Sequence, residues 1–327
     1  MRLVIDLQAY QSPESRHRGI GRFSLALSRA MVRTSGQHEC VLALNSALPD
    51  SIGPVRSAFD GLLPPERIRC WASTSPVAED PCGGPQRSLL AGELLRQAMR
   101  EYRPDFVHIG SLFEGLGSDV VGVVGTRSEG LPTAVTLHDL IPLVHADAYL
   151  TKPEVREWYM RKIAQIKRAE LLFANSAFTR MEGIELLDFA PDRIINIRAA
   201  CDSNFRPLRM DELERRRLHH RFGIDRPYVM YAGGFDPRKN ITHLIRAYAA
   251  LPTELLATHQ LLIVGALPPP EQREQFEALR KEVGLSESQC FFSGYVSDED
   301  LVALYSDCRL YAFPSLQEGF GLPALEA

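Results

Sequence analysis

The chain has 327 residues, of which 45% are hydrophobic and 24% are charged, and its formal net charge is −4 at pH 7. At roughly 150 residues per domain, this length predicts two domains, each with its own hydrophobic core. The composition is that of a globular protein, and the weakly negative net charge argues against a broad nucleic-acid-binding surface. The six cysteines are scattered and form no C-x-x-C pair, so we expect them to be reduced.

The N-terminal segment passes directly into an expected strand at residues 3–7. It lacks the long apolar run of a signal peptide, and no segment approaches the ~20 apolar residues that a membrane-spanning helix needs. We therefore expect a cytoplasmic protein. Peripheral contact with the cytoplasmic face of a membrane stays open as an alternative.

Strands and helices alternate through the first half of the chain, which predicts a parallel sheet with helices on both faces. A region punctuated by Pro64-Pro65 and by the Pro-, Gly- and Ser-rich residues 73–86 receives no assignment. One expected helix, at residues 151–169, takes Thr151 as its N-cap. The strands are expected at residues 3–7, 40–44, 105–110, 133–137, 171–174 and 194–197, and the other helices at residues 19–31 and 89–102.

The pattern breaks at residues 202–207, where we place the boundary between a first domain of residues 1–205 and a second domain of residues 206–327. The order of elements then restarts and predicts a second doubly wound α/β domain. Because one residue follows Glu326, a helix that starts at Leu322 has no room to finish, and we expect the second domain to be incomplete. The strands are expected at residues 228–232, 260–264, 290–292 and 308–314, and the helices at residues 211–222, 241–248, 271–283 and 298–305.

The most informative stretch follows the last expected strand. Gly319 and Gly321 permit a tight turn in which backbone can approach a ligand, and Pro323 suits the first turn of a helix. The free N–H groups at a helix start attract an anion, and the carboxylates of Glu318 and Glu326 can bind hydroxyl groups. The pattern predicts a ligand that combines phosphate with sugar.

Two further loops carry candidate binding residues. Arg238 and Lys239 follow a Gly-Gly pair after the first strand of the second domain, where adjacent cations can neutralise a diphosphate. Gly19 and Gly21 occupy the corresponding loop of the first domain, although a lone G-x-G also marks ordinary turns. The alternative for Arg238 and Lys239 is a solvated pair at a helix entry.

His138 follows a strand at the carboxyl edge of the first predicted sheet, where sites form in parallel α/β proteins. A lone histidine at such a position is equally compatible with a structural role. For Glu326 the alternative is a solvated position on the helix surface.

The sequence disfavours several other classes of site. It has no G-x-x-x-x-G-K-[ST] loop, no metal-spaced Cys or His cluster and no G-x-S-x-G elbow. No acidic residue follows the second strand near residues 44–46, which argues against a nicotinamide dinucleotide site. We expect no cofactor and no metal, so that Arg238, Lys239, backbone amides and a helix dipole stabilise a leaving diphosphate.

The spacing of Glu318 and Glu326, in Pro-Ser-Leu-Gln-Glu-Gly-Phe-Gly-Leu-Pro-Ala-Leu-Glu, resembles the E-x7-E signature of glycosyltransferase family 4, the retaining GT-B enzymes. Residues 233–240, 174–180 and 294–296 resemble that family's diphosphate-binding loop, a loop late in its first domain and its base-binding segment. Residues 4–8, 18–22 and 137–142 resemble the mannosyltransferases that build bacterial O-antigen and related surface polysaccharides. The resemblance covers most of the chain. It implies a GT-B fold, in which two Rossmann-like domains face each other across a cleft.

The resemblance also implies transfer of a hexose from a nucleotide diphosphate sugar, with retention at the anomeric carbon and without a bound metal. It assigns Glu318 and His138 to the donor sugar as catalytic residues. Many family members carry an arginine where this chain has Gly234-Phe235, so more of the phosphate charge would rest on Arg238. The donor-binding residues that the resemblance implies are Arg238, Lys239, Glu326, Gly19, Gly21, Gly319, Phe320, Gly321 and Leu322.

The same resemblance favours GDP-mannose as the donor and a growing surface polysaccharide or lipid-linked oligosaccharide as the acceptor, in lipopolysaccharide biosynthesis. Trp158 and Tyr159, among basic residues of the expected helix at 152–168, could lie near an anionic membrane, or the helix is simply amphipathic and solvated. Two other functions remain as alternatives. One is a nucleotide-sugar 2-epimerase of the same fold, which the E-x7-E spacing disfavours, and the other is a non-catalytic nucleotide-sugar-binding fragment.

Overall fold

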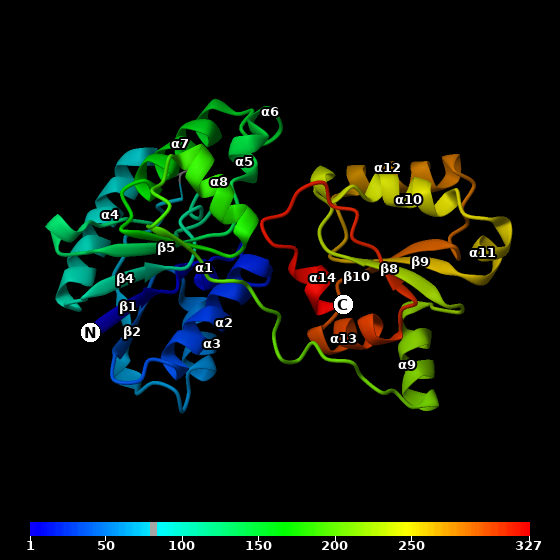
Figure 1. Ribbon diagram of the computed structural model, residues 1–327, viewed down its shortest axis with the longest axis horizontal. Coiled ribbons are helices and arrows are strands. Elements are labelled where there is room, and N and C mark those ends of the chain that lie inside the picture. The colour runs from blue at the N-terminus through cyan, green and yellow to red at the C-terminus, as the bar shows by residue number, and fades with distance from the viewer. Residues whose placement is uncertain (79–83) are drawn as a thin grey trace. The chain divides into compact units, whose positions relative to one another are not determined.

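The computed structural model describes residues 1–78 and 84–327. The chain divides into two compact units, Met1–Ala199 and Ala200–Ala327, and each is built around its own parallel sheet (Figure 1). The division falls shortly before the predicted boundary at residue 205. Each unit has helices on both faces of its sheet, which is the doubly wound α/β architecture that the alternation of elements predicts.

The first unit contains a seven-stranded sheet in the order β3-β2-β1-β4-β5-β6-β7. Strand β1 pairs with β2 on one side and with β4 on the other. The chain therefore adds β2 and β3 toward one edge of the sheet and then crosses over to add β4 to β7 toward the other edge. The loops after β1 and β4 therefore lie next to each other, at the point where ligands bind in open α/β sheets. The strands are β1 (Arg2–Asp6), β2 (Glu39–Asn45), β3 (Ile68–Trp71), β4 (Phe106–Ile109), β5 (Thr133–Leu137), β6 (Leu171–Ala174) and β7 (Ile194–Asn196).

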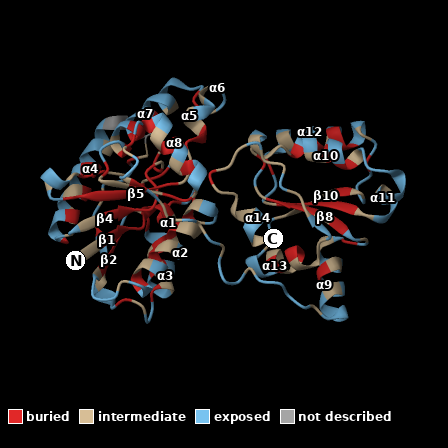
Figure 2. Ribbon diagram, in the orientation of Figure 1, coloured by how far each residue is buried: buried red, intermediate tan, exposed pale blue. Residues whose placement is uncertain are grey.

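Successive residues of the central strands enter two separate cores, because side chains alternate between the faces of a sheet. Val4 and Val41 pack with residues of α4 (Gly84–Glu101) and α7 (Pro153–Ile166). Ile5 and Leu42 pack on the other face, with residues of α2 (Gly19–Arg33) and α3 (Ile52–Ala58). A sheet covered on both faces needs apolar residues at nearly every position, which accounts for the continuous apolar runs in the sequence. Figure 2 shows these strands as buried and the outer helix faces as exposed.

The second unit contains a four-stranded parallel sheet in the order β10-β9-β8-β11. Tyr231 and Ile263 pack with α10 (Ile241–Ala249) and α12 (Pro270–Glu282), whereas Met230 and Leu262 pack with α9 (Glu212–Phe222) and α13 (Asp298–Asp307). As in the first unit, the first strand lies between the second and the fourth. The strands are β8 (Tyr228–Ala232), β9 (Gln260–Val264), β10 (Cys290–Gly294) and β11 (Leu310–Tyr311).

The crossover helix α8 and several shorter helices and 3-10 turns complete the two units. The helices are α1 (Gln8–Gln11), α5 (Ile141–Val144), α6 (Ala146–Tyr149), α8 (Ala177–Leu187), α11 (Thr253–Thr258) and α14 (Leu322–Glu326), and the turns include η1 (Pro49–Ser51), η2 (Pro65–Arg67), η4 (Arg127–Glu129) and η5 (Pro237–Lys239).

The strands predicted at residues 133–137, 171–174, 228–232 and 260–264 are confirmed with the same bounds. Two local predictions are wrong. Helix α7 begins at Pro153 after Lys152, so Thr151 is not its N-cap, and the strand expected at residues 308–314 forms only Leu310–Tyr311 beside β8. The five cysteines in the described part of the chain form no disulfide, and Cys82 lies outside it.

The aromatic residues of α7 belong to the core. Trp158 and Tyr159 are only 7% and 3% exposed, and the Lys162 ammonium lies 5.8 Å from the centre of the Trp158 ring. These two rings are therefore not exposed for membrane contact, and peripheral contact of the chain with a membrane stays a prediction. Within residues 1–78 and 84–327, no helix combines the length and the apolar character needed to cross a bilayer.

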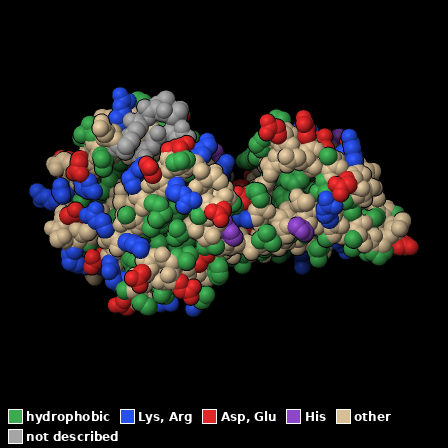
Figure 3. All heavy atoms as spheres, turned by 90° about the horizontal axis from the view of Figure 1, so that it is seen from above, with side chains coloured by type: hydrophobic (Ala, Val, Ile, Leu, Met, Phe, Trp, Pro, Cys, Tyr) green, Lys and Arg blue, Asp and Glu red, His purple; other side chains and the backbone are tan. Residues whose placement is uncertain are grey.

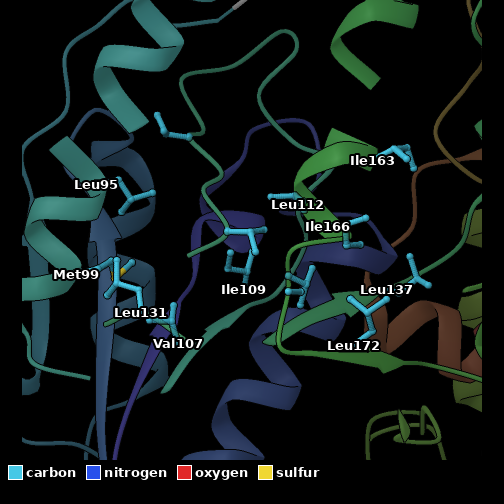
Figure 4. Close-up of a cluster of buried hydrophobic side chains, with 14 of the residues drawn as sticks. Leu95, Met99, Val107, Ile109, Leu112, Leu131, Leu137, Ile163, Ile166 and Leu172 are labelled. Carbon is cyan, nitrogen blue, oxygen red and sulfur yellow. The ribbon is translucent and has the colours of Figure 1, made fainter. Parts of the chain in front are cut away.

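One helix of the first unit offers a matched test of this packing. Figure 4 shows Leu95 and Met99 of α4 in the core with Ile109 of β4 and Ile166 of α7. Leu95 is 2% exposed, whereas Leu89 on the same helix is 69% exposed. We predict that Leu95→Ala lowers the free energy of unfolding by about 2–5 kcal/mol, because it leaves a cavity.

Urea denaturation of both variants measures this difference. Leu89→Ala, as the control, should change the free energy of unfolding by less than about 0.5 kcal/mol. Equal effects of the two substitutions would contradict the placement of α4.

Candidate functional site

The carboxyl edge of the second sheet brings two loops together. Because β8 lies between β9 and β11, the loop after β8 meets the loop after β11. The Leu316 N–H donates to the Arg238 carbonyl at 2.8 Å, and the Asn240 side-chain amide donates to the Pro314 carbonyl at 3.2 Å. These contacts hold together the two candidate segments that lie about eighty residues apart in the sequence.

Glu318 binds both of the candidate cations. Arg238 Nη1 donates to Oε2 of Glu318 at 2.7 Å, and Lys239 Nζ donates to Oε1 at 2.5 Å. Arg238 Nη1 also donates to the Gln317 carbonyl at 2.9 Å. The side chains of Arg238, Lys239 and Glu318 are 22%, 15% and 17% exposed, so water screens their charges only in part. The structure thus brings Glu318 together with the pair of Arg238 and Lys239, which the sequence analysis had singled out in another loop.

The charges of this cluster nearly cancel before any ligand binds. Burial acts to raise the pKa of Glu318, but the hydrogen bond and charge of Lys239, with the charge of Arg238, outweigh burial and hold that pKa below its usual range. Asp236 Oδ1 lies 3.6 Å from Arg238 Nε and adds a second carboxylate. Two cations therefore face two carboxylates, and an arriving diphosphate would compete with Glu318 for Arg238 and Lys239.

The turn that presents the cations is built by two residues that the sequence analysis missed. Asp236 caps η5 by accepting the Arg238 N–H at 3.1 Å, and Asn240 ends the turn with a φ of +60°. Asparagine is one of the few side chains that adopt this left-handed conformation readily. An Asp-Pro pair followed three residues later by Asn is the local signal that could have revealed both roles.

Residues 319–322 form the predicted glycine turn and helix start. Gly319 is buried, Phe320 and Leu322 are half-buried, and Gly321 has a φ of +90°. Helix α14 begins at Leu322 with Pro323 in its first turn, as predicted. A side chain at Gly321 would also lie 3.1 Å from the Phe313 ring. The left-handed conformation therefore favours glycine at this position, and a Cβ would crowd the ring.

Glu326 lies in α14, in the same neighbourhood as Glu318. Burial raises the pKa of Tyr311, and the charges of Glu326 and Glu318 act in the same direction. Tyr311 therefore lies within electrostatic range of both glutamates of the E-x7-E pair. Its hydroxyl donates to the Ala232 carbonyl at the end of β8 at 3.2 Å.

In the first unit, Gly19 and Gly21 start helix α2. The Gly21 N–H donates to the Ser15 carbonyl at 3.2 Å, and a Cβ at Gly21 would lie only 2.3 Å from that oxygen. A Cβ at Gly19 would meet no atom within 4 Å. Gly21 is thus needed to pack the helix start on the preceding loop, whereas the backbone at Gly19 is open to an approaching ligand.

His138 lies at the end of β5, against the first turns of α2. Its Nε2 is 2.8 Å from the Gly110 carbonyl, and its ring meets the Phe23 ring edge-on with centroids 5.4 Å apart. Burial lowers the pKa of His138, and this effect exceeds the opposing ones of Gly110 and Asp139. Since a carbonyl only accepts, Nε2 carries the hydrogen and Nδ1 of the neutral ring is an acceptor. Such a nitrogen can receive a hydrogen bond from a sugar hydroxyl.

In the part of the chain that the structure describes, no group of three or more His, Cys, Asp or Glu residues could hold a metal ion. On the face that Figure 3 shows, basic and acidic side chains are interspersed over each unit.

Comparisons with known proteins identify the family of this chain. Residues 17–204 match the family model described as Glycosyltransferase Family 4, and residues 214–327 match the model Glycosyl transferases group 1. The chain belongs to glycosyltransferase family 4. The fold of this family 4 glycosyltransferase is GT-B, as its E-x7-E signature implied.

Two curated relatives resemble the family 4 chain over nearly its whole length. It is 37% identical to the serotype-specific mannosyltransferase WbdA of Escherichia coli over 328 residues, which is all of this chain and 39% of WbdA. It is 30% identical to the O-antigen chain mannosyltransferase B of Escherichia coli, over 94% of this chain and 76% of that protein. The chain thus spans well under half the length of WbdA.

A solved structure supports the fold of the family 4 chain. The structure of Anabaena Alr3699/HepE in complex with UDP and glucose matches 98% of this chain and 76% of its own, with a TM-score of 0.64 and 18% identity. At 18% identity, this structural similarity supports the fold only. Together, these comparisons support a glycosyltransferase and give no support to a 2-epimerase.

The pairing of Glu318 with two cations in this family 4 chain has a consequence for its stability. Because the pKa of Glu318 is lowered in the folded state, its ion pairs stabilise the fold above the usual glutamate pKa of about 4.3, and this contribution is lost as the pH falls through the folded-state value. We predict that Glu318→Gln lowers the free energy of unfolding by about 1–3 kcal/mol at neutral pH. The difference in the free energy of unfolding between this variant and the wild type should become smaller at acidic pH.

Urea denaturation at neutral pH and near pH ~3.5 measures this difference. The control is Glu282→Gln, because Glu282 is 63% exposed in its pair with Arg246 and should contribute at most about 1 kcal/mol. A Glu318→Gln deficit that is absent at neutral pH, or that grows in acid, would contradict the assigned ion pairs.

Proposed function

We propose that this chain transfers a hexose, with retention at the anomeric carbon, from a nucleotide diphosphate sugar to a sugar hydroxyl of its acceptor. The proposed donor is GDP-mannose, and the proposed acceptor is a growing surface polysaccharide or a lipid-linked oligosaccharide. The observation that carries the proposal is the cluster of Arg238, Lys239 and Glu318 at the switch point of the second sheet. The choice of mannose is supported by the mannosyltransferase names of its two relatives.

In this proposal, Arg238 and Lys239 bind the diphosphate. The bond between the anomeric carbon and the phosphate oxygen breaks, and negative charge accumulates on that oxygen. The oxygen of the acceptor hydroxyl attaches to the anomeric carbon, and the hydroxyl proton passes to the leaving phosphate oxygen. Fixed cations in a partly buried site stabilise such charge without reorganisation of solvent. The reaction would need no bound metal or other cofactor, because the two side chains and the backbone amides of the turn at residues 319–322 supply the positive potential.

Glu318, once a diphosphate has drawn the cations toward itself, would accept hydrogen bonds from hydroxyls of the donor sugar. Glu326 would bind the ribose hydroxyls, and His138 would accept a hydrogen bond from a sugar hydroxyl through Nδ1. The turn of Gly319, Phe320, Gly321 and Leu322 would line the donor, with Gly19 and Gly21 bordering the diphosphate. The first unit would serve the acceptor and the second the nucleotide sugar.

We place the reaction in the cytoplasm. The chain would meet the cytoplasmic membrane peripherally, through its lipid-linked acceptor, rather than through the aromatic residues of α7, which are buried. We propose no nucleic acid as a partner of this chain.

The test is a panel of GDP- and UDP-sugars incubated with the full chain and an oligosaccharide acceptor, with release of the nucleoside diphosphate as the readout. We expect release from GDP-mannose and a fall of at least about 100-fold in turnover for Lys239→Ala, because one stabilising cation is lost.

The matched control is Lys281→Ala, which removes an exposed lysine from α12 in the same unit and should leave turnover unchanged. Release from no sugar in the panel, or equal turnover by Lys239→Ala and the wild type, would overturn the proposed function.

A further inference from the structure

A second buried glutamate lies at the switch point of the first sheet. Glu114 follows β4, is 5% exposed, and has the hydroxyl of Ser15 at 2.9 Å from each of its carboxylate oxygens. Among the residues that the structure describes, Glu114 forms no ion pair with a basic side chain. A buried carboxylate without a cation is costly, so its hydrogen bonds to the loop around Ser15 must offset its lost hydration.

Ser15 connects this carboxylate to the glycine loop. The Ser15 carbonyl accepts the N–H groups of Arg18 at 2.9 Å and Gly21 at 3.2 Å. The start of α2 rests on the same peptide, since a Cβ at Gly21 would lie 2.3 Å from the Ser15 carbonyl oxygen and 2.7 Å from Arg16 Cα. The position of Ser15 is therefore coupled to that of the backbone at residues 18–21.

The second unit contains the same arrangement. There, the fourth strand of the sheet, β11, pairs with the first, β8, and Glu318 reaches from the loop after β11 to the loop after β8. In the first unit β4 pairs with β1, and Glu114 reaches from the loop after β4 to the loop after β1. In each unit a glutamate holds the loop that presents candidate ligand-binding groups, through cations in one and through a serine hydroxyl in the other.

We propose that Glu114 is a positioning residue for the glycosyl transfer, which holds the loop of residues 15–21 through Ser15 and so fixes the open backbone at Gly19, to which the proposed function assigns diphosphate binding. This inference rests on the proposed function for its ligand and on the hydrogen bonds of Ser15 for its geometry. Glu114 itself contacts no reacting atom. Burial raises the pKa of Glu114 against the opposing effect of its hydrogen bond with Ser15, as expected for a buried carboxylate that has no cation beside it.

The geometry is tested by amide hydrogen exchange on the ligand-free chain. We expect the Arg18 and Gly21 amides to exchange about tenfold faster in Glu114→Gln and in Ser15→Ala, because each variant weakens a hydrogen bond to a charged group. The double variant should be no faster than the worse single variant, since both act through one contact. Unchanged protection of β5 amides would show that each variant is folded.

The matched control is Glu129→Gln. Glu129 also lies in the first unit and accepts a backbone N–H, that of Thr126 at 2.8 Å, but it caps η4 rather than the glycine loop. Its removal should leave the Arg18 and Gly21 amides unchanged. Equal exchange of these amides in wild type, Glu114→Gln and Ser15→Ala would overturn the positioning role.

The effect of Glu114 on the proposed reaction is tested by the kinetics of nucleoside diphosphate release from GDP-mannose. We expect Glu114→Gln to lower kcat about tenfold with a smaller change in KM, because the loop would border charge that develops as the diphosphate leaves. Faster amide exchange with unchanged kcat would overturn the functional part alone. A wild-type chain that releases no diphosphate would overturn the proposed function and this ligand role together, while the exchange result would still decide whether Glu114 holds the loop.

Discussion

The candidate site of the second unit depends on the ion pairs that the Glu318 carboxylate forms with Arg238 and Lys239. This carboxylate accepts hydrogen bonds from two adjacent cations on one loop and is itself carried by another loop, so its charge both joins the loops and sets where Arg238 and Lys239 point. Without a carboxylate at this place, two like charges side by side would repel each other in a partly buried environment. In the proposed function, the phosphate oxygens of the ligand would replace the carboxylate oxygens of Glu318 as partners of the two cations.

The sheet topology decides which loops can meet in this way. In both units the first strand is paired on either side by the second and the fourth, so the loops after the first and fourth strands become neighbours at the carboxyl edge. Glu318 and Glu114 use this adjacency with different partners, one with cations and the other with a serine hydroxyl. The fold therefore supplies the proximity, and the side chains determine whether a loop presents charge or open backbone.

Much of the fold follows from the sequence, because strands buried on both faces read as continuous apolar runs such as residues 133–137 and 260–264. The short strand β3 was missed since its pattern, buried at Ile68 and Trp71 and exposed between them, is too short to stand out beside Pro64-Pro65. The residues of the proposed donor site could also be singled out from motif and spacing. The sequence did not predict the pairing of Glu318 with both cations or the burial of Trp158 and Tyr159. Each of these depends on contacts between segments far apart in the sequence.

Calorimetric titration of GDP, with UDP in parallel, into the wild type and Glu318→Gln tests most directly whether Arg238 and Lys239 form the diphosphate site. If Glu318 competes with a diphosphate for the two cations, the neutral glutamine should tighten the binding of GDP or UDP severalfold, on the order of 1 kcal/mol. Weaker binding by Glu318→Gln, or binding unchanged from the wild type, would contradict this account of the site.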